Sequence, residues 1–236
     1  MSTFSRACRT TLSRLYNLGS PAATVILLRD APTGIECLLL LKSQKQRFGG
    51  LHVFPGGAVD PADEVYEDGD LDVLSTVTNA AIRELHEETN LDARPGWFTL
   101  LSHWMPPGFD ASRRGKVFST FFLTGAASSD SQAARVDGDE IVLHHWLTPE
   151  RALALYSSGE LPMLPPTLHT LTTVRDATYD AQSAEEALRV LATTEARSFH
   201  LNTAASAARA LPHVWPAFLR WLLVRWRVRL RGPERS

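Results

Sequence analysis

The stretch AAIRELHEETN, residues 80–90, places three glutamates within five positions of an otherwise apolar pattern. At helical periodicity over about residues 72–89, one arc of roughly 100° gathers Leu74, Ala81, Ile82 and Leu85. A neighbouring arc of about the same width holds Glu84, Glu87 and Glu88. The segment therefore predicts a helix with a core face beside a carboxylate face.

Like charges at positions i, i+3 and i+4 of a helix repel one another unless a cation lies between them. Arg83 is the adjacent cation in the sequence, and one arginine cannot neutralise three carboxylates. Hard oxygen ligands on a rigid element suit Mg²⁺ or Mn²⁺, which bind substrate phosphates. By spacing alone, a metal site for phosphate chemistry and a solvated acidic surface are about equally favoured. The glycines of GGLHVFPGGAVD, residues 49–60, favour the metal site.

The charge of the chain is unevenly distributed. Residues 1–29 contain four arginines and no acid, residues 201–236 contain seven arginines and one glutamate, and the net charge is −2. The centre of the chain is therefore strongly acidic, which argues against a nucleic-acid partner. The two cysteines favour a reducing, intracellular compartment. We expect a cytoplasmic protein, with a mitochondrial one as the alternative because the acid-free N-terminus also fits a transit peptide.

The pattern of apolar runs and turn residues indicates a mixed α/β protein. A strand hairpin is predicted from residues 23–28 and 36–42, and three further strands from residues 97–105, 116–125 and 140–147. Thr148 and Pro149 form a helix start, and further helices are expected within residues 164–174 and 183–196. The acidic segment 61–72 is expected to be a solvated loop.

The order of FPGGAVD and RELHEETNL resembles the signature of the Nudix hydrolase superfamily. Arg83, Glu84, Leu85, Glu87, Glu88 and Leu91 match its second half. The surrounding pattern extends the resemblance over residues 21–165. Two departures stand out: the family has its glycine fourteen residues before the arginine, whereas Gly57 precedes Arg83 by 26, so that twelve residues are inserted. Ser75 then stands where the family has its first glutamate, with Asp70 or Asp72 as substitutes, and Asn90 replaces the final glycine.

This resemblance implies an α/β fold, a Nudix-type α/β/α sandwich with a mixed β-sheet and added C-terminal helices. It also implies an enzyme, a pyrophosphohydrolase dependent on Mg²⁺ or Mn²⁺ and acting on a small-molecule diphosphate. The metal ligands would be Glu84, Glu87, Glu88 and the Gly57 carbonyl, and Arg83 would orient a glutamate. The general base would be Glu84 or Glu140, although Glu140 equally fits a plain loop residue.

Looser motifs, PAATVILL and HVFPGGAVDPAD, resemble the branch of the superfamily that includes the peroxisomal coenzyme A diphosphatase and its bacterial relatives. That branch implies coenzyme A or acyl-coenzyme A as substrate. The alternatives are a hydrolase of nucleoside diphosphates linked to another moiety and a non-catalytic Nudix-type module that only binds ligand.

Three parts of the chain are predicted: an N-terminal extension or targeting segment at residues 1–20, the Nudix domain at 21–165, and a helical extension packed on it at 166–236. Within the last part, residues 213–232 have an apolar stripe that includes Trp215 and Trp226, with arginines opposite. Such a helix fits docking onto the domain or onto a second copy in a homodimer, or contact with a membrane surface.

Histidines offer a competing, zinc-based reading. His144 and His145 are neighbours on a predicted strand and would point to opposite faces, so they cannot hold one ion together. His52, next to the glycine-rich segment, is more readily explained as a structural residue than as a substrate contact.

Overall fold

The computed structural model describes residues 6–46, 48–93, 95–105, 117–127, 134–136, 138–193 and 197–200. Its main sheet has the strand order β10-β7-β8-β1-β2-β3, with β4 paired to β1 and β9 paired to β2. The strands are β1 (Ser20–Ala31), β2 (Gly34–Lys42), β3 (His52–Val53), β4 (Gly56–Ala58), β7 (Phe98–Met105), β8 (Phe118–Ala126), β9 (Ile141–Leu147) and β10 (Arg197–His200). Because β1–β8 and β10–β7 are parallel and the other pairs antiparallel, the sheet is mixed, as predicted.

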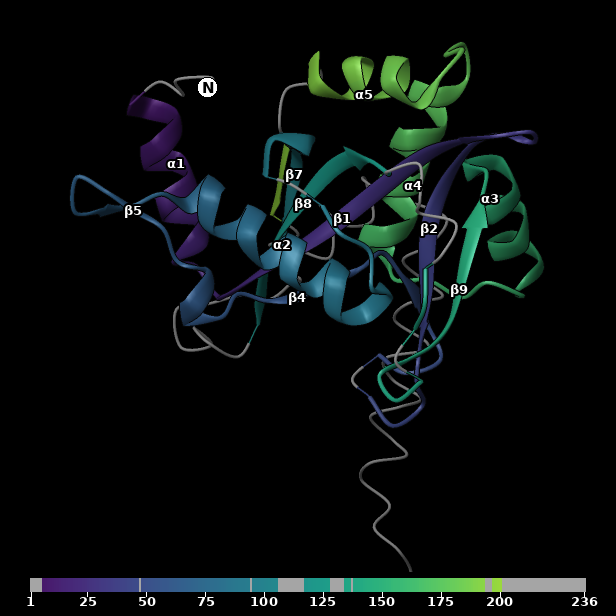
Figure 1. Cartoon of the computed structure of the whole chain (residues 1–236), viewed down its shortest axis with the longest axis horizontal. Coiled ribbons are helices and arrows are strands. Elements are labelled where there is room, and N and C mark those ends of the chain that lie inside the picture. Colours follow the sequence, from purple (N-terminus) through teal and green to yellow (C-terminus); the bar gives the residue numbers. More distant parts are fainter. Residues whose placement is uncertain are drawn as a thin grey trace, which may run out of the picture.

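Helices cover both faces of this sheet (Figure 1). One face carries α1 (Arg6–Tyr16) and α2 (Val73–Thr89), and the other carries α3 (Pro149–Ser158), α4 (Pro165–Thr178) and α5 (Ala184–Thr193). Alternation along the strands separates two hydrophobic clusters: Val25 and Leu27 face α2, whereas Ile26 and Leu28 face the other layer. The predicted α/β/α sandwich with added helices is confirmed.

The helix α1 contributes to the core, with Leu12, Leu15 and Tyr16 buried against the α2 side of the sheet. The helix α1 thus packs on the sheet directly before β1 in the chain. Among the described residues, none of the helices has the length and apolar character that a membrane span requires. The predicted amphipathic segment 213–232, with its membrane or dimer contact, lies outside the described residues.

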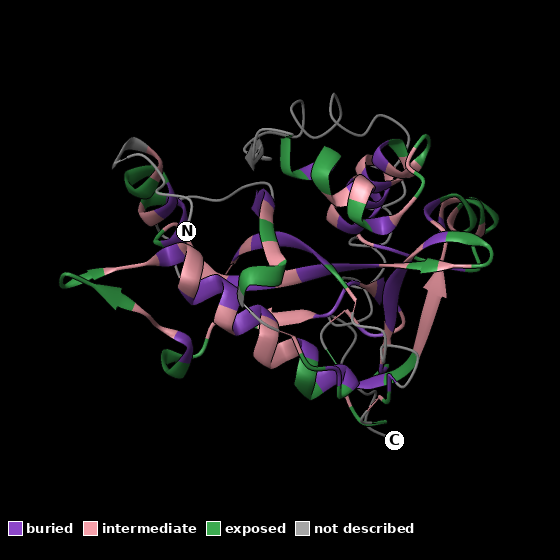
Figure 2. Ribbon diagram, turned by 45° about the horizontal axis from the view of Figure 1, so that its top comes forward, coloured by how far each residue is buried: buried purple, intermediate pink, exposed green. Residues whose placement is uncertain are grey.

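The acidic segment before α2 departs from the solvated loop that we predicted. It begins with a 3-10 helix, η1 (Pro61–Asp63), and continues as a two-stranded hairpin of β5 (Tyr66–Glu67) and β6 (Asp70–Leu71). Asp68 and Gly69 both have positive φ angles, 53° and 86°, which is the geometry of the tight turns that favour Asp-Gly. The hairpin projects from the body of the molecule and is exposed (Figure 2), but Asp63 at its base is only 5% exposed. A second 3-10 helix, η2 (Pro95–Trp97), precedes β7.

Candidate active site

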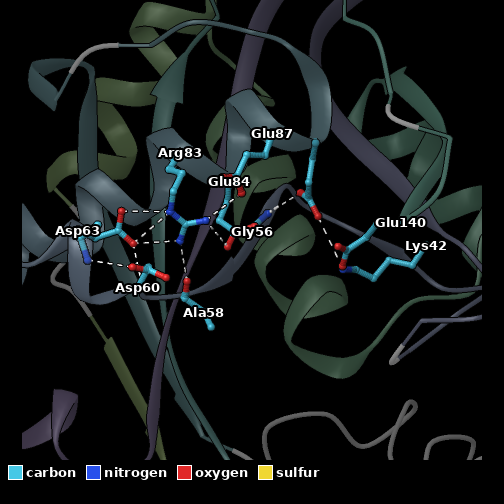
Figure 3. Close-up of polar contacts among 11 residues, drawn as sticks. Lys42, Gly56, Ala58, Asp60, Asp63, Arg83, Glu84, Glu87 and Glu140 are labelled. Carbon is cyan, nitrogen blue, oxygen red and sulfur yellow. Dashed lines mark hydrogen bonds and ion pairs between the residues drawn. The ribbon is translucent and has the colours of Figure 1, made fainter.

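The helix α2 is fixed at both ends by its own sequence. Asp72 is the N-cap and accepts a hydrogen bond from the Ser75 amide, while Asn90 ends the helix in the left-handed conformation, with φ 56°. Asparagine tolerates this conformation, which explains how it replaces glycine there. Leu85 is fully buried in the cluster on this side of the sheet. Glu84 and Glu87 both turn toward Arg83 (Figure 3), and Glu88 accepts a hydrogen bond from the Gly56 amide. The predicted core face is confirmed only for Ala81 and Leu85, because Leu74 and Ile82 are half-buried. The buried side of the helix also includes Val77, Ala80 and Glu88, although the periodicity places Glu88 in the carboxylate arc.

Two consecutive glycines in β4 allow the backbone to approach these carboxylates. Gly56 has φ 153°, and a Cβ there would lie 2.3 Å from the Ala23 carbonyl oxygen of β1. Its N–H donates a 2.9 Å hydrogen bond to Glu88 Oε2. A Cβ on Gly57 would lie 2.3–2.5 Å from all three atoms of the Glu84 carboxylate. Side chains at either position would push the strand or the carboxylates away.

Arg83 organises one half of the site. Its Nη1 donates to Glu84 and to Glu87, both at 2.9 Å, and its Nη2 donates to the Ala58 carbonyl at 2.8 Å. Nη2 also forms a 2.9 Å ion pair with Asp63, which Nε contacts as well. The planar guanidinium thus ties α2 to β4 and η1, a geometry that an ammonium cannot supply (Figure 3).

Lys42, the last residue of β2, organises the other half. Its Nζ lies 2.7 Å from Glu140 Oε1 and 3.7 Å from Glu88 Oε1. The Lys42 and Glu88 side chains are 13% and 4% exposed, whereas Glu140 is 45% exposed. Glu140 directly precedes β9, and its carbonyl accepts from the Ser43 amide. The pairing of β2 with β9 therefore brings Glu140 to the end of α2.

Burial dominates the electrostatics of the carboxylates. Desolvation raises the pKa of Glu88 to about 8, although Lys42 and the Gly56 N–H act in the opposite direction. Desolvation also raises the pKa of Glu84, against the effect of Arg83. The charge of Glu140 makes a smaller upward contribution to the pKa of both glutamates. Five carboxylates, counting Asp63 and Glu87, face two cations, and this excess of negative charge favours a bound cation.

Asp63 takes the position of the family's first glutamate, which the count from Arg83 had assigned to Ser75. In the family pattern the first glutamate lies eight residues before the arginine and therefore six after the glycine. Counting back from Arg83 leads to Ser75, but counting forward from Gly57 leads to Asp63, which holds Arg83. Its other carboxylate contact, a 2.8 Å hydrogen bond from the Asp60 amide, fixes it in η1. The twelve inserted residues thus fall after Asp63 and include the β5–β6 hairpin.

The substitutes suggested for that glutamate are wrong. Asp72 is occupied as the N-cap of α2, where it also accepts from the Ser75 hydroxyl at 2.5 Å. Asp70 is exposed on β6. A count from the glycine would have found Asp63, and the Asp-Gly pair at residues 68–69 would have found the hairpin.

The predicted residues otherwise come together, with one revision to the argument from charge. Gly57 lies against Glu84, Arg83 contacts Glu84 and Glu87, and Lys42 joins Glu88 to Glu140. Figure 3 shows this chain of contacts from Arg83 to Glu140. Arg83 is not the sole cation near the glutamates, because Lys42 approaches from 46 residues away in sequence. Across the described part of the chain, no three Asp, Glu, His or Cys side chains are arranged around one point as metal ligands. In the cluster, these carboxylates are directed at Arg83, Lys42 and Gly56 instead.

The three histidines considered as candidates lie on two strands, His52 on β3 and His144 and His145 on β9. His144 pairs with Leu40 and His145 with Leu39, so they face opposite sides of the sheet as predicted. The His52 ring packs against His145 with centroids 5.5 Å apart, and burial lowers its pKa to about 4. A buried neutral ring of this kind is structural.

Comparison with known proteins finds a matching family model and similar solved structures. The family model of the NUDIX domain matches residues 19–165. A NUDIX hydrolase from Alicyclobacillus acidocaldarius superposes with a TM-score of 0.56 at 21% identity, over 72% of this chain and 96% of that chain. The NUDIX domain of Shewanella oneidensis NrtR, crystallised with ADP ribose, gives 0.48 at 18% identity, over 73% and 98% of the two chains.

Proposed function

Because this chain belongs to the NUDIX family and is a pyrophosphohydrolase, we propose that it cleaves the diphosphate linkage of coenzyme A or acyl-coenzyme A with Mg²⁺ or Mn²⁺ bound. The observation that carries the proposed chemistry is that Glu84 and Glu88 lie against the Gly56–Gly57 backbone, with three further carboxylates joined to this pair through Arg83 and Lys42. The choice of coenzyme A is supported by the resemblance of residues 21–28 and 52–63 to the coenzyme A diphosphatase branch. Nucleoside diphosphates linked to another group are the alternative substrates.

The donor set fits a hard divalent cation. Glu84, Glu87, Glu88 and the Gly57 carbonyl would offer oxygen ligands only, which Mg²⁺ and Mn²⁺ prefer. Burial of Glu88 with a raised pKa is unfavourable for its anion, and a nearby cation would offset that cost. When bound, the cation would neutralise the diphosphate oxygens and make water a better nucleophile.

The side chains of this protein would do the remaining work. Arg83 holds Glu84 and Glu87 in fixed positions through charge-assisted hydrogen bonds. A carboxylate must take the proton of the attacking water, and Glu84 and Glu140 are the two candidates. The pKa of Glu84 is raised by burial, which favours it as the proton acceptor, since an efficient base has a pKa nearer to the working pH. Phosphoryl transfer then depends mainly on this positioning and on charge.

A substrate panel tests the proposal. Coenzyme A, acetyl-coenzyme A, NADH and ADP-ribose would each be incubated with the protein, with Mn²⁺, with Mg²⁺ and with EDTA. We expect phosphate-ester products from coenzyme A or its thioester with the highest kcat/KM, and none in EDTA. Higher kcat/KM on NADH or ADP-ribose would replace the substrate assignment, and undiminished turnover in EDTA would refute the metal dependence.

A further inference from the structure

Lys42 is held rigidly at the edge of the carboxylate cluster. Its amide donates to the Leu51 carbonyl at 3.1 Å, and its carbonyl accepts from the Gly50 amide at 2.8 Å. It continues the β2 face that carries Leu38 and Leu40, both fully buried on the α2 side of the sheet. The ammonium group therefore cannot retreat into the core, and its position toward the glutamates follows from the strand.

The two oxygens of Glu88 have different partners. Oε2 accepts the Gly56 N–H at 2.9 Å, and this hydrogen bond does not involve Oε1. That same Oε1 lies 3.7 Å from Lys42 Nζ. A Mg²⁺ ion bound to Oε1, at about 2.1 Å, would lie less than about 6 Å from the ammonium. Two like charges at that distance in a half-buried site repel strongly.

Glu140 adds to the same competition. Its Oε1 is 2.7 Å from Lys42 Nζ, so one ammonium joins carboxylates that come from two separate elements of the fold. The ammonium supplies the charge that a divalent cation would otherwise supply. A cation entering between Glu88 and Glu140 has to displace Lys42 or bind against its repulsion.

We propose that Lys42 is the built-in competitor of the metal ion: it holds Glu88 and Glu140 together in the metal-free protein and lowers the affinity of the site for divalent cations. The proposal rests on the metal dependence given under the proposed function. Lys42 is thereby given a positioning role that differs from that of an ordinary structural ion pair. A purely structural lysine would leave the metal affinity unchanged, or would increase the affinity by ordering the ligands.

Direct metal binding tests this role without any substrate. The dissociation constant of Mn²⁺ would be measured from the electron paramagnetic resonance signal of the free ion, at one pH, for the parent, Lys42→Met and Lys42→Arg. We expect Lys42→Met to bind Mn²⁺ at least about tenfold more tightly, because a like charge is removed. Lys42→Arg, which keeps the charge, is expected to stay within about threefold of the parent.

Lys45→Met is the matched control, because Lys45 is exposed three residues further along the chain. It is expected to bind Mn²⁺ like the parent. Lys42→Gln, which can still donate a hydrogen bond to Glu140, replaces Lys42→Met if circular dichroism shows that the latter is unfolded. An unchanged or weaker affinity in the charge-removing variant overturns the role of Lys42 while leaving the proposed function intact. Failure of the parent to bind Mn²⁺ overturns both.

Discussion

The two halves of the carboxylate cluster are built in different ways. In the Arg83 half, the cation and two of its acids, Glu84 and Glu87, lie on one helix within five residues. In the Lys42 half, the cation comes from β2 and its acids from α2 and the residue before β9, 46 and 98 residues away. The first half is set mainly by local sequence, and the second exists only once the sheet has formed.

This difference predicts different consequences for the two cations. Arg83 satisfies a buried acid, Asp63, and a backbone carbonyl, so it stabilises the fold as well as the ligand geometry. Lys42 contacts one acid whose pKa is already raised to about 8 and one that is half exposed. We therefore expect the Arg83 half to govern stability and the Lys42 half to govern the response to cations and protons.

Removing the charge of Glu88 should have the largest effect. Glu88→Gln is expected to lower kcat by about 100-fold or more at saturating Mg²⁺, because a ligand charge is lost from the reacting site. The fold is expected to persist, since the amide oxygen can still accept the Gly56 N–H. Steady-state kinetics and circular dichroism check this, with Glu150→Gln on the exposed start of α3 as the control. Parent-like turnover in Glu88→Gln would contradict the metal-site assignment.

Removing the Arg83 side chain is expected to lower the stability of the fold. Arg83→Met leaves Asp63 buried without its cation and is expected to reduce the free energy of unfolding by about 3 kcal/mol. Urea unfolding in EDTA provides the measurement. Combining it with Asp63→Asn should cost clearly less than the two single changes added together, because both remove the same pair. Strict additivity would mean that Asp63 and Arg83 act independently.

The Lys42 half is expected to make the free energy of unfolding depend on pH. The pKa of Glu88 is raised by burial from its usual value to about 8, so its contribution to stability is complete below about pH 4.5 and is lost as the pH rises toward 8. In EDTA, the parent should lose up to about 1.4 kcal/mol of stability per pH unit relative to Glu88→Gln over this range. Urea unfolding at three pH values gives the two slopes, and parallel slopes would show that Glu88 is not the titrating group.

The smallest expected effect on kcat tests which residue stands at the position of the family's first glutamate. Asp63→Asn is expected to lower kcat about tenfold by loosening Arg83, whereas Ser75→Ala, which loses only its hydroxyl contact to Asp72, should stay within about twofold. Kinetics of the two variants side by side decides between them. A larger loss of kcat in Ser75→Ala than in Asp63→Asn would instead assign that position to Ser75.

Much of the fold was predictable because its signals are local. The strands of the β1–β2 hairpin, the helix α2 and the Thr148–Pro149 start of α3 follow from periodicity and capping residues. Lys42 was missed because nothing in KSQKQR distinguishes it from a solvated lysine until β2 pairs with β9. Gly56 was missed as a hydrogen-bond donor because a backbone N–H leaves no mark in the sequence. Asp63 was hidden by counting from one end of an interrupted motif.

The β5–β6 hairpin is closed at its base by the Asp72 amide, which donates to the Val65 carbonyl at 2.8 Å. Asp63 and the start of α2 are thereby held in place whatever length of chain joins them. A foreign peptide inserted between Asp68 and Gly69 would be displayed in solvent, because both residues are exposed at the tip of a hairpin that projects from the molecule (Figure 2). This turn therefore offers a permissive site for an epitope tag or a fluorescent reporter that leaves α2 and its carboxylates in place.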